Sequence, residues 1–402
     1  FSCFMGGLGY LIIVLTGCWD RQEPEKLAVI LVAGYDYNPM KDMYKLIVQI
    51  ESSQAMQSGG QGGSGGGETP AFWTVSAWGH TPLDALANIR KKVSRELYYA
   101  HLHLLIISEK LVKTEGILTV MDVLARSRQS RPIVEIAVAK GDVEKIMTVD
   151  FPIESTNGFG LINQINITRE ELGTAILQKG RKFLNKLSTP GIEPVAITLE
   201  FLKKENENNT KSQSSTKPDT PPKVKISGLT AFKQDKMTGR LNDREARGWN
   251  WISDQPASGI INFTYPGNKD TKVTVITHKV FSKITPIYKN GKPTIKINVE
   301  VTGRLASVTG LSYFKEHSEI TQSLQKRLAE AVRNDIQRAI NKAKKLKSDI
   351  FGFGNAFYRL KYDKWSNIKD NWEQKFVKLP VKTNINATIK RTGLVNKGII
   401  LR

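Results

Sequence analysis

TPLDALANIRKKVSRELYYAHLHLLIIS, residues 81–108, is the stretch that decides the fold class. Thr81 is a favoured N-cap residue, Pro82 suits the first helical position and Asp84 falls in the first turn, so a helix is expected to begin here. Apolar residues then recur at helical spacing: Leu83, Leu86, Ile89, Val93 and Leu97. The segment HLHLLIIS that follows has the composition of a buried strand. A helix that leads into a buried strand indicates an α+β or α/β domain.

The flanking segments alternate strands and helices in the same way. Residues 27–50 predict two strands joined by a turn through Asn38 and Pro39, and AFWTVSAWG predicts a third strand. Residues 117–125 suggest a helix, and residues 132–139 again have the composition of a strand. We therefore expect an N-terminal α+β domain over residues 18–150.

A second region with its own helix and strand signals follows. Thr168 and Glu171 match a capping box and predict the start of a helix. Its expected apolar side consists of Leu172, Ala175, Ile176, Phe183 and Leu187. VAITLEF and VKISGLTAF predict two strands, and residues 203–222 between them, rich in Asn, Lys, Ser, Thr and Pro, predict a mobile loop. These elements are expected to form a middle α+β domain over residues 151–256.

The last region, residues 257–402, predicts a hairpin and a long helix. In ITPIYKNGKPTIKINVEV, the pair Asn290-Gly291 favours a tight two-residue turn. Apolar residues at helical spacing over residues 320–347 predict an amphipathic helix that ends near Gly352. VKTNINATIKRTG then alternates like a closing strand. We expect a C-terminal α+β domain built from these parts.

The other side of the long helix is strongly basic. Glu330 and Asp335 are interspersed among its cations, which are Lys326, Arg327, Arg333, Arg338, Lys342, Lys344, Lys345 and Lys347. Two interpretations stay open: a solvated helix face, or a contact surface for acidic lipid or protein.

The chain opens with the features of an export signal. Residues 4–15 are apolar or small, a length typical of a signal-peptide h-region and short of the roughly 20 residues that a transmembrane helix needs. No basic n-region precedes them and the first residue is Phe1, so residues 1–17 are expected to be a signal peptide with a truncated start.

LTGCWD, residues 15–20, then matches a bacterial lipobox. We expect cleavage between Gly17 and Cys18 and a diacylglyceryl group on the Cys18 thiol, because a thiol is the strongest nucleophile available there. Two acyl chains suffice for stable anchoring. The alternative is an unmodified thiol at the end of an N-terminal membrane anchor.

The formal net charge of +21 favours anionic partners, among them lipid headgroups and wall polymers. Nucleic acid is not an expected partner, because the chain has no basic motif with interleaved aromatic residues. The two cysteines, Cys3 and Cys18, both lie in the first 18 of 402 residues, so the body of the protein has no disulfide framework.

No pattern in the sequence favours catalysis or a cofactor. His101 and His103 are expected on one face of a strand, where they lack the further ligands that zinc requires. GxSxG and GxGxxG matches within residues 60–66 lie in polar linker instead of joining a strand to a helix, which makes them accidental. Phe232, Trp249 and Trp251 could line a small-molecule pocket, although core packing is the more common role of such residues. We expect neither catalytic nor metal-binding residues, and no cofactor.

Four blocks of sequence resemble the Ger(x)C family, the C-subunit lipoproteins of bacterial spore germinant receptors. They are LTGCWD with Glu25 soon after; YYAHLHLLIISEKLVKTEGILTVMDVLARSRQSR; GLTAFKQDKMTGRLNDREARGWNWI; and INKAKKLKSDIFGFGNAFYRLKYDKW followed by Trp372. Their order, their separations and their place behind a lipobox make the match specific.

The resemblance implies three α+β domains, each a mixed or antiparallel sheet flanked by helices. It also implies a non-enzymatic lipoprotein on the outer face of the spore inner membrane, assembled with polytopic A and B subunits and required for nutrient-triggered germination. An alternative stays open, in which the soluble domains themselves hold the nutrient. A third hypothesis, an anchored enzyme acting on wall or lipid, has no catalytic pattern to support it.

Overall fold

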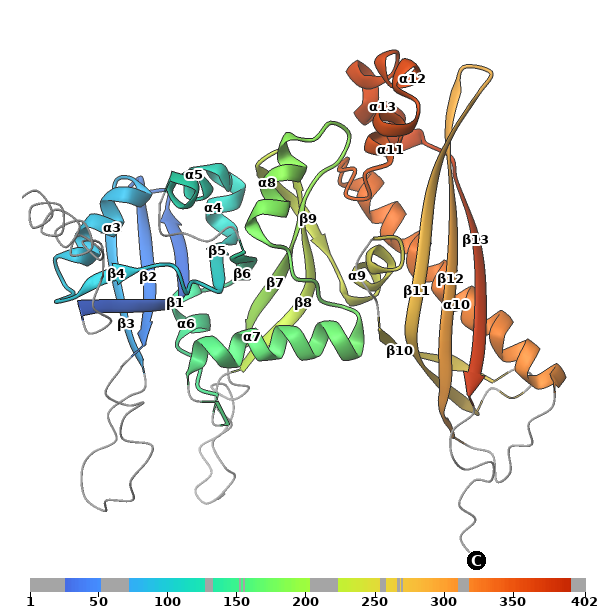
Figure 1. Ribbon diagram of the computed structural model, residues 1–402, viewed down its shortest axis with the longest axis horizontal. Coiled ribbons are helices and arrows are strands. Elements are labelled where there is room, and N and C mark those ends of the chain that lie inside the picture. The colour runs from blue at the N-terminus through green and yellow to red at the C-terminus, as the bar shows by residue number, and fades with distance from the viewer. Residues whose placement is uncertain are drawn as a thin grey trace, which may run out of the picture.

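The computed structural model describes residues 26–51, 72–126, 133–253 and 258–391, apart from residues 152, 155, 203–222, 266–267, 269 and 310–317. Two sheets lie side by side along the long axis of the molecule, each covered by helices (Figure 1). The predicted fold class, mixed sheets flanked by helices, is confirmed. The predicted signal peptide, Cys18 and the predicted mobile loop at 203–222 fall outside the described residues.

The first sheet is mixed and has nine strands in the order β3-β2-β1-β5-β6-β7-β8-β9, with β4 paired beside β1. β1, β5, β6 and β7 run parallel to one another, whereas β2, β3, β8 and β9 join through antiparallel pairs. The strands are β1 (Leu27–Asn38), β2 (Met43–Glu51), β3 (Phe72–Gly79), β4 (Glu96–Tyr98), β5 (Leu104–Ser108), β6 (Glu135–Lys140), β7 (Val195–Leu202), β8 (Lys223–Lys233) and β9 (Lys236–Leu241).

Helices cover both faces of this sheet, which explains why its central strands are almost continuously apolar. In β5, Leu105 and Ile107 enter the core beneath α3, α4, α5 and α8, while Leu104 and Ile106 enter the core beneath α6 and α7. The helices are α3 (Pro82–Arg90), α4 (Glu109–Thr114), α5 (Leu118–Arg126), α6 (Val143–Met147), α7 (Asn157–Ile167), η2 (Thr168–Leu172), α8 (Gly180–Ser188) and α9 (Asp243–Asn250).

The second sheet has four strands in the order β10-β11-β12-β13: β10 (Gly259–Thr264), β11 (Lys272–Lys289), β12 (Lys292–Thr309) and β13 (Val381–Arg391). Asn290 and Gly291 form the predicted turn between β11 and β12, with φ of 50° and 74°. These positive φ values are those that a tight hairpin turn requires and that Asn and Gly tolerate.

α10 (Ser318–Lys345) runs diagonally across one face of this sheet (Figure 1). The residues of its predicted apolar side from Leu324 onward are buried: Leu324, Leu328, Val332, Ile336, Ile340 and Ala343. Short helices gather beyond its C-terminal end: α11 (Phe353–Leu360), α12 (Tyr362–Ser366), η3 (Lys369–Asn371) and α13 (Trp372–Lys378).

Three predicted helix boundaries need correction. Thr168 does not begin a helix, because η2 continues α7 at this residue. The Thr168 hydroxyl donates to the Gln164 carbonyl oxygen at 2.8 Å instead of capping a new helix. The chain leaves that helix at Gly173, which has a left-handed φ of 64°. α3 ends at Arg90 before the predicted apolar stripe does, and Leu97 lies in β4. α10 ends at Lys345, while Gly352 is instead the residue before α11.

The predicted boundary near residue 150 falls within one continuous sheet. β7, from the predicted middle domain, pairs with β6 of the predicted N-terminal domain through Ala137↔Ile197 and the pairs that follow. The described strands thus form two sheets, where the sequence had suggested three. The change from the first sheet to the second comes between Leu241 and Gly259, around the other predicted boundary at 256. The division into domains at 150 and 256 stays a prediction.

Candidate interaction surfaces

The predicted lipid-attachment residue lies shortly before the first sheet. Gly17 and Cys18 are outside the described residues, and β1 begins at Leu27, nine residues after Cys18. At 3.3–3.6 Å per residue, a chain of this length spans at most about 32 Å. A lipid on Cys18 would therefore hold the start of β1 within about 32 Å of a membrane surface. No helix among the described ranges is long and apolar enough to cross a membrane.

The two sheets meet at a joint built around the buried carboxylate of Asp349. It accepts hydrogen bonds from the backbone N–H of Phe353 at 3.0 Å, from the N–H of Gly354 at 2.8 Å and from Trp372 Nε1 at 3.1 Å. The backbone oxygen of Asp349 accepts from the N–H of Glu193, at the entrance to β7, at 2.9 Å. One residue thus orders the turn after α10 and ties it to the first sheet.

Glycines let the backbones approach closely at this joint. A Cβ on Gly354 would lie 2.7 Å from Trp372 Nε1 and 2.8 Å from the Cα of Gly191. Gly191 itself has a φ of 71°, and its carbonyl oxygen accepts from the N–H of Asn355 at 2.8 Å. Any side chain at either glycine would push α11 away from the loop before β7. The FGFGNAF segment is therefore a packing motif.

Two acidic groups at the joint have raised pKa values. Burial raises the pKa of Asp349 to about 6, although its N–H donors act in the opposite direction. Burial also raises the pKa of Glu193 to about 7, and the negative charge of Asp349 adds to that rise. Glu193 accepts from the backbone N–H of Gln234 at 2.7 Å. Both carboxyls are engaged in holding backbone.

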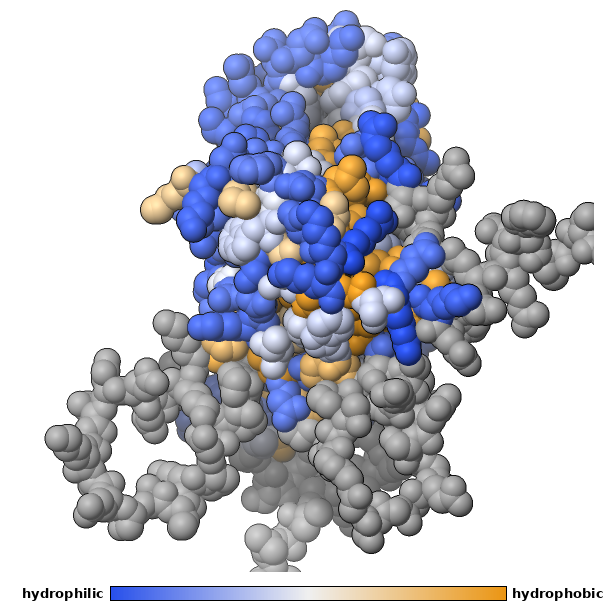
Figure 2. All heavy atoms as spheres, turned by 90° about the vertical axis from the view of Figure 1, so that its left-hand side faces the viewer, coloured by the Kyte–Doolittle hydropathy of each residue, from blue (hydrophilic) through white to orange (hydrophobic). Residues whose placement is uncertain are grey.

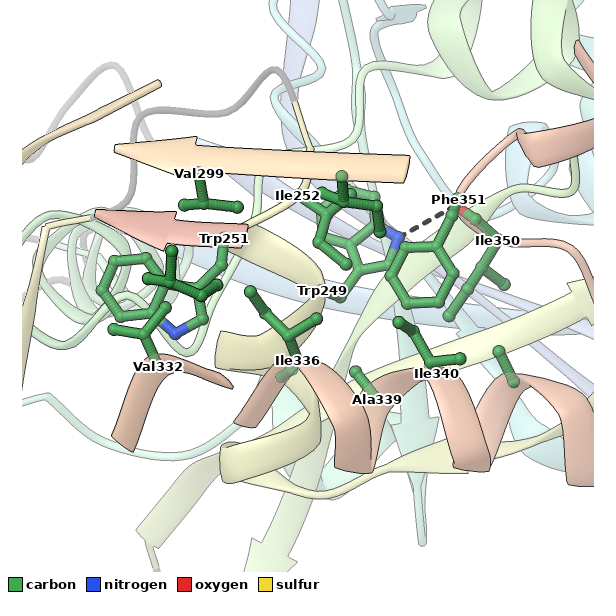
Figure 3. Close-up of a cluster of buried hydrophobic side chains, with 14 of the residues drawn as sticks. Trp249, Trp251, Ile252, Val299, Val332, Ile336, Ala339, Ile340, Ile350 and Phe351 are labelled. Carbon is green, nitrogen blue, oxygen red and sulfur yellow. Dashed lines mark hydrogen bonds between the residues drawn. The ribbon is translucent and has the colours of Figure 1, made fainter. Parts of the chain in front are cut away.

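The aromatic residues considered for a pocket are core residues, and they do not form one group. Trp249 and Trp251 of the α9 region pack against α10 and the second sheet, and Trp249 Nε1 donates to the Ile350 carbonyl oxygen at 2.9 Å (Figure 3). Phe232 lies in the core of the first sheet, edge-on to Phe183 at 5.1 Å between ring centroids. Core packing, the more common role, is what the structure shows.

α9 is bound to α10 by close packing and by a largely buried ion pair. Gly248 faces the carbonyl oxygen of Asp335, and a Cβ on it would lie 2.9 Å from the Cβ of Ala339. Arg247 Nε lies 2.8 Å from Asp335 Oδ2, and its Nη1 donates to the Ile260 carbonyl oxygen at 3.2 Å. Asp335, predicted on the basic side of the helix, thus serves to hold α9 and β10.

The rest of that basic side is largely solvent-facing. Lys344 donates to the Leu379 carbonyl oxygen at 2.6 Å, Arg327 pairs with Glu330 at 3.0 Å and Lys347 lies 3.8 Å from Glu373. The exposed cations for which the described part of the chain shows no acidic partner are Lys326, Arg333, Arg338 and Lys345. We call these four residues the basic face of α10.

A polar groove of about 690 Å³ adjoins the basic face. It runs between β10, α9 and α10, and arginines from both helices line it: Arg244, Arg247, Arg327 and Arg338. Asp243, Glu330 and Asp335 lie in the same lining, so the groove carries charges of both signs. Because of these mixed charges, the groove suits a polar contact with another protein surface better than the binding of a strongly charged small molecule.

The histidines do not converge. His101 and His103 are both exposed and come just before β5, and His103 faces the ring of Phe159 at 6.4 Å. Within the ranges that the structure describes, no group of three or more His, Cys, Asp or Glu side chains could hold a metal ion.

Two family models match this chain over most of its length. "Spore germination protein N-terminal domain" matches residues 20–201, and "Spore germination B3/GerAC like, C-terminal" matches residues 227–393. This chain belongs to the Ger(x)C family. The resemblance stated from the sequence is confirmed. The first Ger(x)C model ends within β7 and the second begins within β8, so the division between them falls inside the nine-stranded sheet.

Curated Ger(x)C relatives match from end to end. "Spore germination protein KC" of Bacillus subtilis (strain 168) is 29% identical over 99% of this chain and 98% of its own length. "Spore germination protein B3" of the same organism is 22% identical over 96% of this chain and 97% of its own. A solved structure, "Crystal Structure of the GerBC protein", is similar with a TM-score of 0.56 and 19% identity, over 89% of this chain and 97% of that one. At that identity, the structural match shows the shared fold alone.

The Ger(x)C sequence blocks that the structure describes lie at the joint between the sheets or beside it in the first sheet, and LTGCWD is outside the described residues. GLTAFKQDKMTGRLNDREARGWNWI forms β8, β9 and α9, and its Arg240 pairs with Glu109 from the HLHLLIISEK block. The block around Asp349 supplies the turn and α11. Sequence reasoning singled out neither Asp349 nor Glu193. The available signal was the run DIFGFG, in which an acid precedes two glycines.

Proposed function

We propose that this chain is the lipid-anchored C subunit of a nutrient germinant receptor, required for nutrient-triggered spore germination. In this proposal a diacylglyceryl group on Cys18 holds it on the outer face of the spore inner membrane, where it assembles with polytopic A and B subunits. The observation that carries the proposal is the end-to-end match to spore germination proteins in a chain whose residues 15–18 match a lipobox.

The non-enzymatic part of the proposal is supported by what two of the acids with raised pKa values do. Asp349 and Glu193 have raised pKa values, as catalytic carboxyls often do. Both instead accept hydrogen bonds from backbone N–H groups at the joint between the sheets. Their environment is accounted for by packing, which favours a role in assembly over catalysis.

The lipid anchor is tested by removing the Cys18 thiol. Cys18→Ala should leave an uncleaved precursor that incorporates no labelled fatty acid, and spores that carry it should lose most of their nutrient response. Ser2→Ala, upstream of the lipobox, is the matched control and should be processed normally. Normal labelling and cleavage of the Cys18→Ala chain would exclude this anchor.

Receptor assembly is tested by crosslinking in spore membranes, followed by identification of the attached chains. Two polytopic subunits should be recovered with the wild-type chain. Deletion of the gene should abolish the response to one set of nutrients while germination by triggers that bypass receptors persists. An unimpaired nutrient response, with no paralogue present, would contradict the proposal.

A second candidate function is that the chain itself holds the nutrient. The observation that favours it is an apolar pocket of about 560 Å³ in the N-terminal half. Calorimetry of residues 19–402 against amino acids and sugars separates the two functions. Saturable heat at one site per chain supports nutrient binding, whereas its absence leaves the assembly role as the function.

A further inference from the structure

An apolar pocket lies between α3 and α5. Its volume of about 560 Å³ lies within the range of small-molecule sites. Tyr35 of β1 belongs to its lining, and the facing sides of the two helices form its walls. None of these residues takes part in the joint or in the basic face of α10.

The walls of the pocket are apolar and incompletely covered. Leu83 and Leu86 line it from α3, and Val123 lines it from α5. Leu83 keeps 59% of its surface exposed, although helices normally turn such a residue towards a neighbour. Apolar side chains also gather among charged ones over the end of the molecule that carries α3 and β3 (Figure 2). The two helix sides thus offer apolar surface that the described part of the chain leaves unfilled.

A buried polar group without a partner lies at the same pocket. Tyr99 is 8% exposed and Tyr35 is 3% exposed, and both line the pocket. The Tyr99 hydroxyl has no hydrogen-bond partner among the residues that the structure describes. An unsatisfied buried hydroxyl costs about 1–3 kcal/mol, so it indicates a missing partner such as a water or a ligand.

One cation complements that hydroxyl. Arg90, at the end of α3, lines the pocket and lies close enough to Tyr99 to lower the pKa of its hydroxyl in part, against the larger effect of burial. The other arginine of the lining, Arg126, is already paired with Asp122 at 2.8 Å. Asp122 lies in the lining too, with its charge offset by Arg126, and the hydroxyls of Thr81 and Thr119 complete the polar set. Arg90 and the Tyr99 hydroxyl are the cation without this acidic partner and the buried donor that face an anionic head.

We infer that this pocket binds a small carboxylic acid with a branched or chain-like apolar body. The apolar body would displace water from Leu83, Leu86 and Val123, and the carboxylate would accept from the Tyr99 hydroxyl and from Arg90. Such binding goes beyond the assembly role and does not depend on it.

The test uses 4-methylpentanoate as the probe and 4-methylpentan-1-ol as its uncharged analogue. Each is titrated into the chain from residue 18 onward, with Cys18→Ser so that no lipid is attached, and binding is followed by saturation-transfer NMR. The acid should bind at least about tenfold more tightly than the alcohol, because a hydrogen bond to a charged group is worth about 1.5–3 kcal/mol. Failure of the acid to bind, or equal binding of both probes, would overturn the inference.

Three variants locate the binding. Leu83→Glu should weaken binding of the acid about tenfold or more, while Leu118→Glu, at a position on α5 that is 46% exposed and outside the pocket, should leave binding unchanged. Tyr99→Phe should weaken binding several-fold and at the same time raise the melting temperature of the ligand-free chain, because it removes the orphan hydroxyl. Unchanged binding by Leu83→Glu would place the probe elsewhere and refute the site.

Discussion

At the scale of single residues, Asp349 holds several segments of the chain together through one buried carboxylate. Its carboxylate oxygens serve three donors that come from the start of α11 and from α13. Its burial costs free energy, as its raised pKa shows. The three hydrogen bonds offset that cost because they order a turn on which both α11 and the loop before β7 depend.

Asp349→Asn should lower the free energy of unfolding by about 2–3 kcal/mol. The amide keeps one acceptor oxygen and turns an NH₂ group towards N–H donors, which leaves at least one buried donor unpaired. Urea denaturation at neutral pH measures the change. The control is Asp363→Asn, at a side chain that is 70% exposed, which should change stability by under about 0.5 kcal/mol. Equal effects of the two variants would show that the Asp349 network is unimportant.

Glu193 predicts how stability depends on pH. Because its pKa in the folded chain, about 7, lies above the ordinary value of 4.5, the folded state binds this proton more tightly than the unfolded state does. Its contribution is fully present below about pH 4.5 and is lost as the pH rises through about 7. Asp349 acts in the same direction between its ordinary value of 3.8 and about 6.

Glu193→Gln should therefore reduce the loss of stability between pH 5 and pH 8. The amide keeps an acceptor for the Gln234 N–H and carries no charge. Urea unfolding at both pH values gives the two differences to compare. Glu170→Gln, where the side chain is 65% exposed beside Arg169, should keep the wild-type difference. The assignment would be contradicted if the free energy of unfolding changed equally between pH 5 and pH 8 in the wild-type chain and in Glu193→Gln. It would also be contradicted if the wild-type chain became more stable over that interval.

At the scale of elements, the packing of α9 on α10 depends on the absence of one side chain. Gly248→Ala should destabilise the chain by about 1–3 kcal/mol, because its methyl group would meet the backbone of α10 at Asp335 and force the helices apart. Arg244→Ala, at an exposed position on the same helix, is the control and should have little effect. Thermal unfolding of both variants checks this, and a neutral Gly248→Ala would show that the two helices can separate at no cost.

Elements that neighbouring residues determine could be predicted from the sequence. Elements that depend on pairing with a segment far away in the sequence could not. The turn at Asn290-Gly291 and the N-cap at Thr81 depend on neighbouring residues, and both occur as predicted. Thr168 has the same local signal, but α7 reaches it from the N-terminal side and continues through it, and its hydroxyl donates to the Gln164 carbonyl oxygen within the helix. Nothing near β7 in the sequence shows that it pairs with β6, so the sheet that crosses residue 150 was not predicted.

The same distinction holds for the candidate surfaces: one could be predicted from local spacing and the other could not. The basic face of α10 could be predicted, because helical spacing alone separates its cations from the buried side. Asp335 shows the limit of that reasoning, since its partner Arg247 is 88 residues away and its burial depends on α9. The pocket beside Tyr99 likewise needs α3, α5 and β1 together, and no segment of sequence contains all three.

At the scale of the whole molecule, the net charge of +21 acts through the surfaces that present it. The basic face of α10 should draw the unlipidated chain onto vesicles that contain phosphatidylglycerol. Replacing Arg333, Arg338 and Lys345 by Gln should weaken this binding by about tenfold or more, since each cation near an anionic surface contributes. Flotation with vesicles at two salt concentrations measures it.

The control removes an equal charge elsewhere. Lys110, Arg181 and Lys296 are exposed and lie away from α10, so their replacement by Gln should weaken binding less. If both triple variants lose the same amount, net charge alone explains the attraction. If neutral vesicles bind the wild-type chain equally well, the basic face is not a lipid contact.

The position of β1 determines how the protein would respond to a force applied through the residues on its N-terminal side. β1 lies inside the first sheet, paired with β4 at Leu27–Val29, with β2 from Ile30 onward and with β5 at Val32–Tyr35. Force from the N-terminal side would load these ladders lengthwise, so that many hydrogen bonds must break together, whereas an outer strand would unzip one bond at a time. The first strand of the described chain is thus mechanically resistant at the end that would carry the proposed anchor.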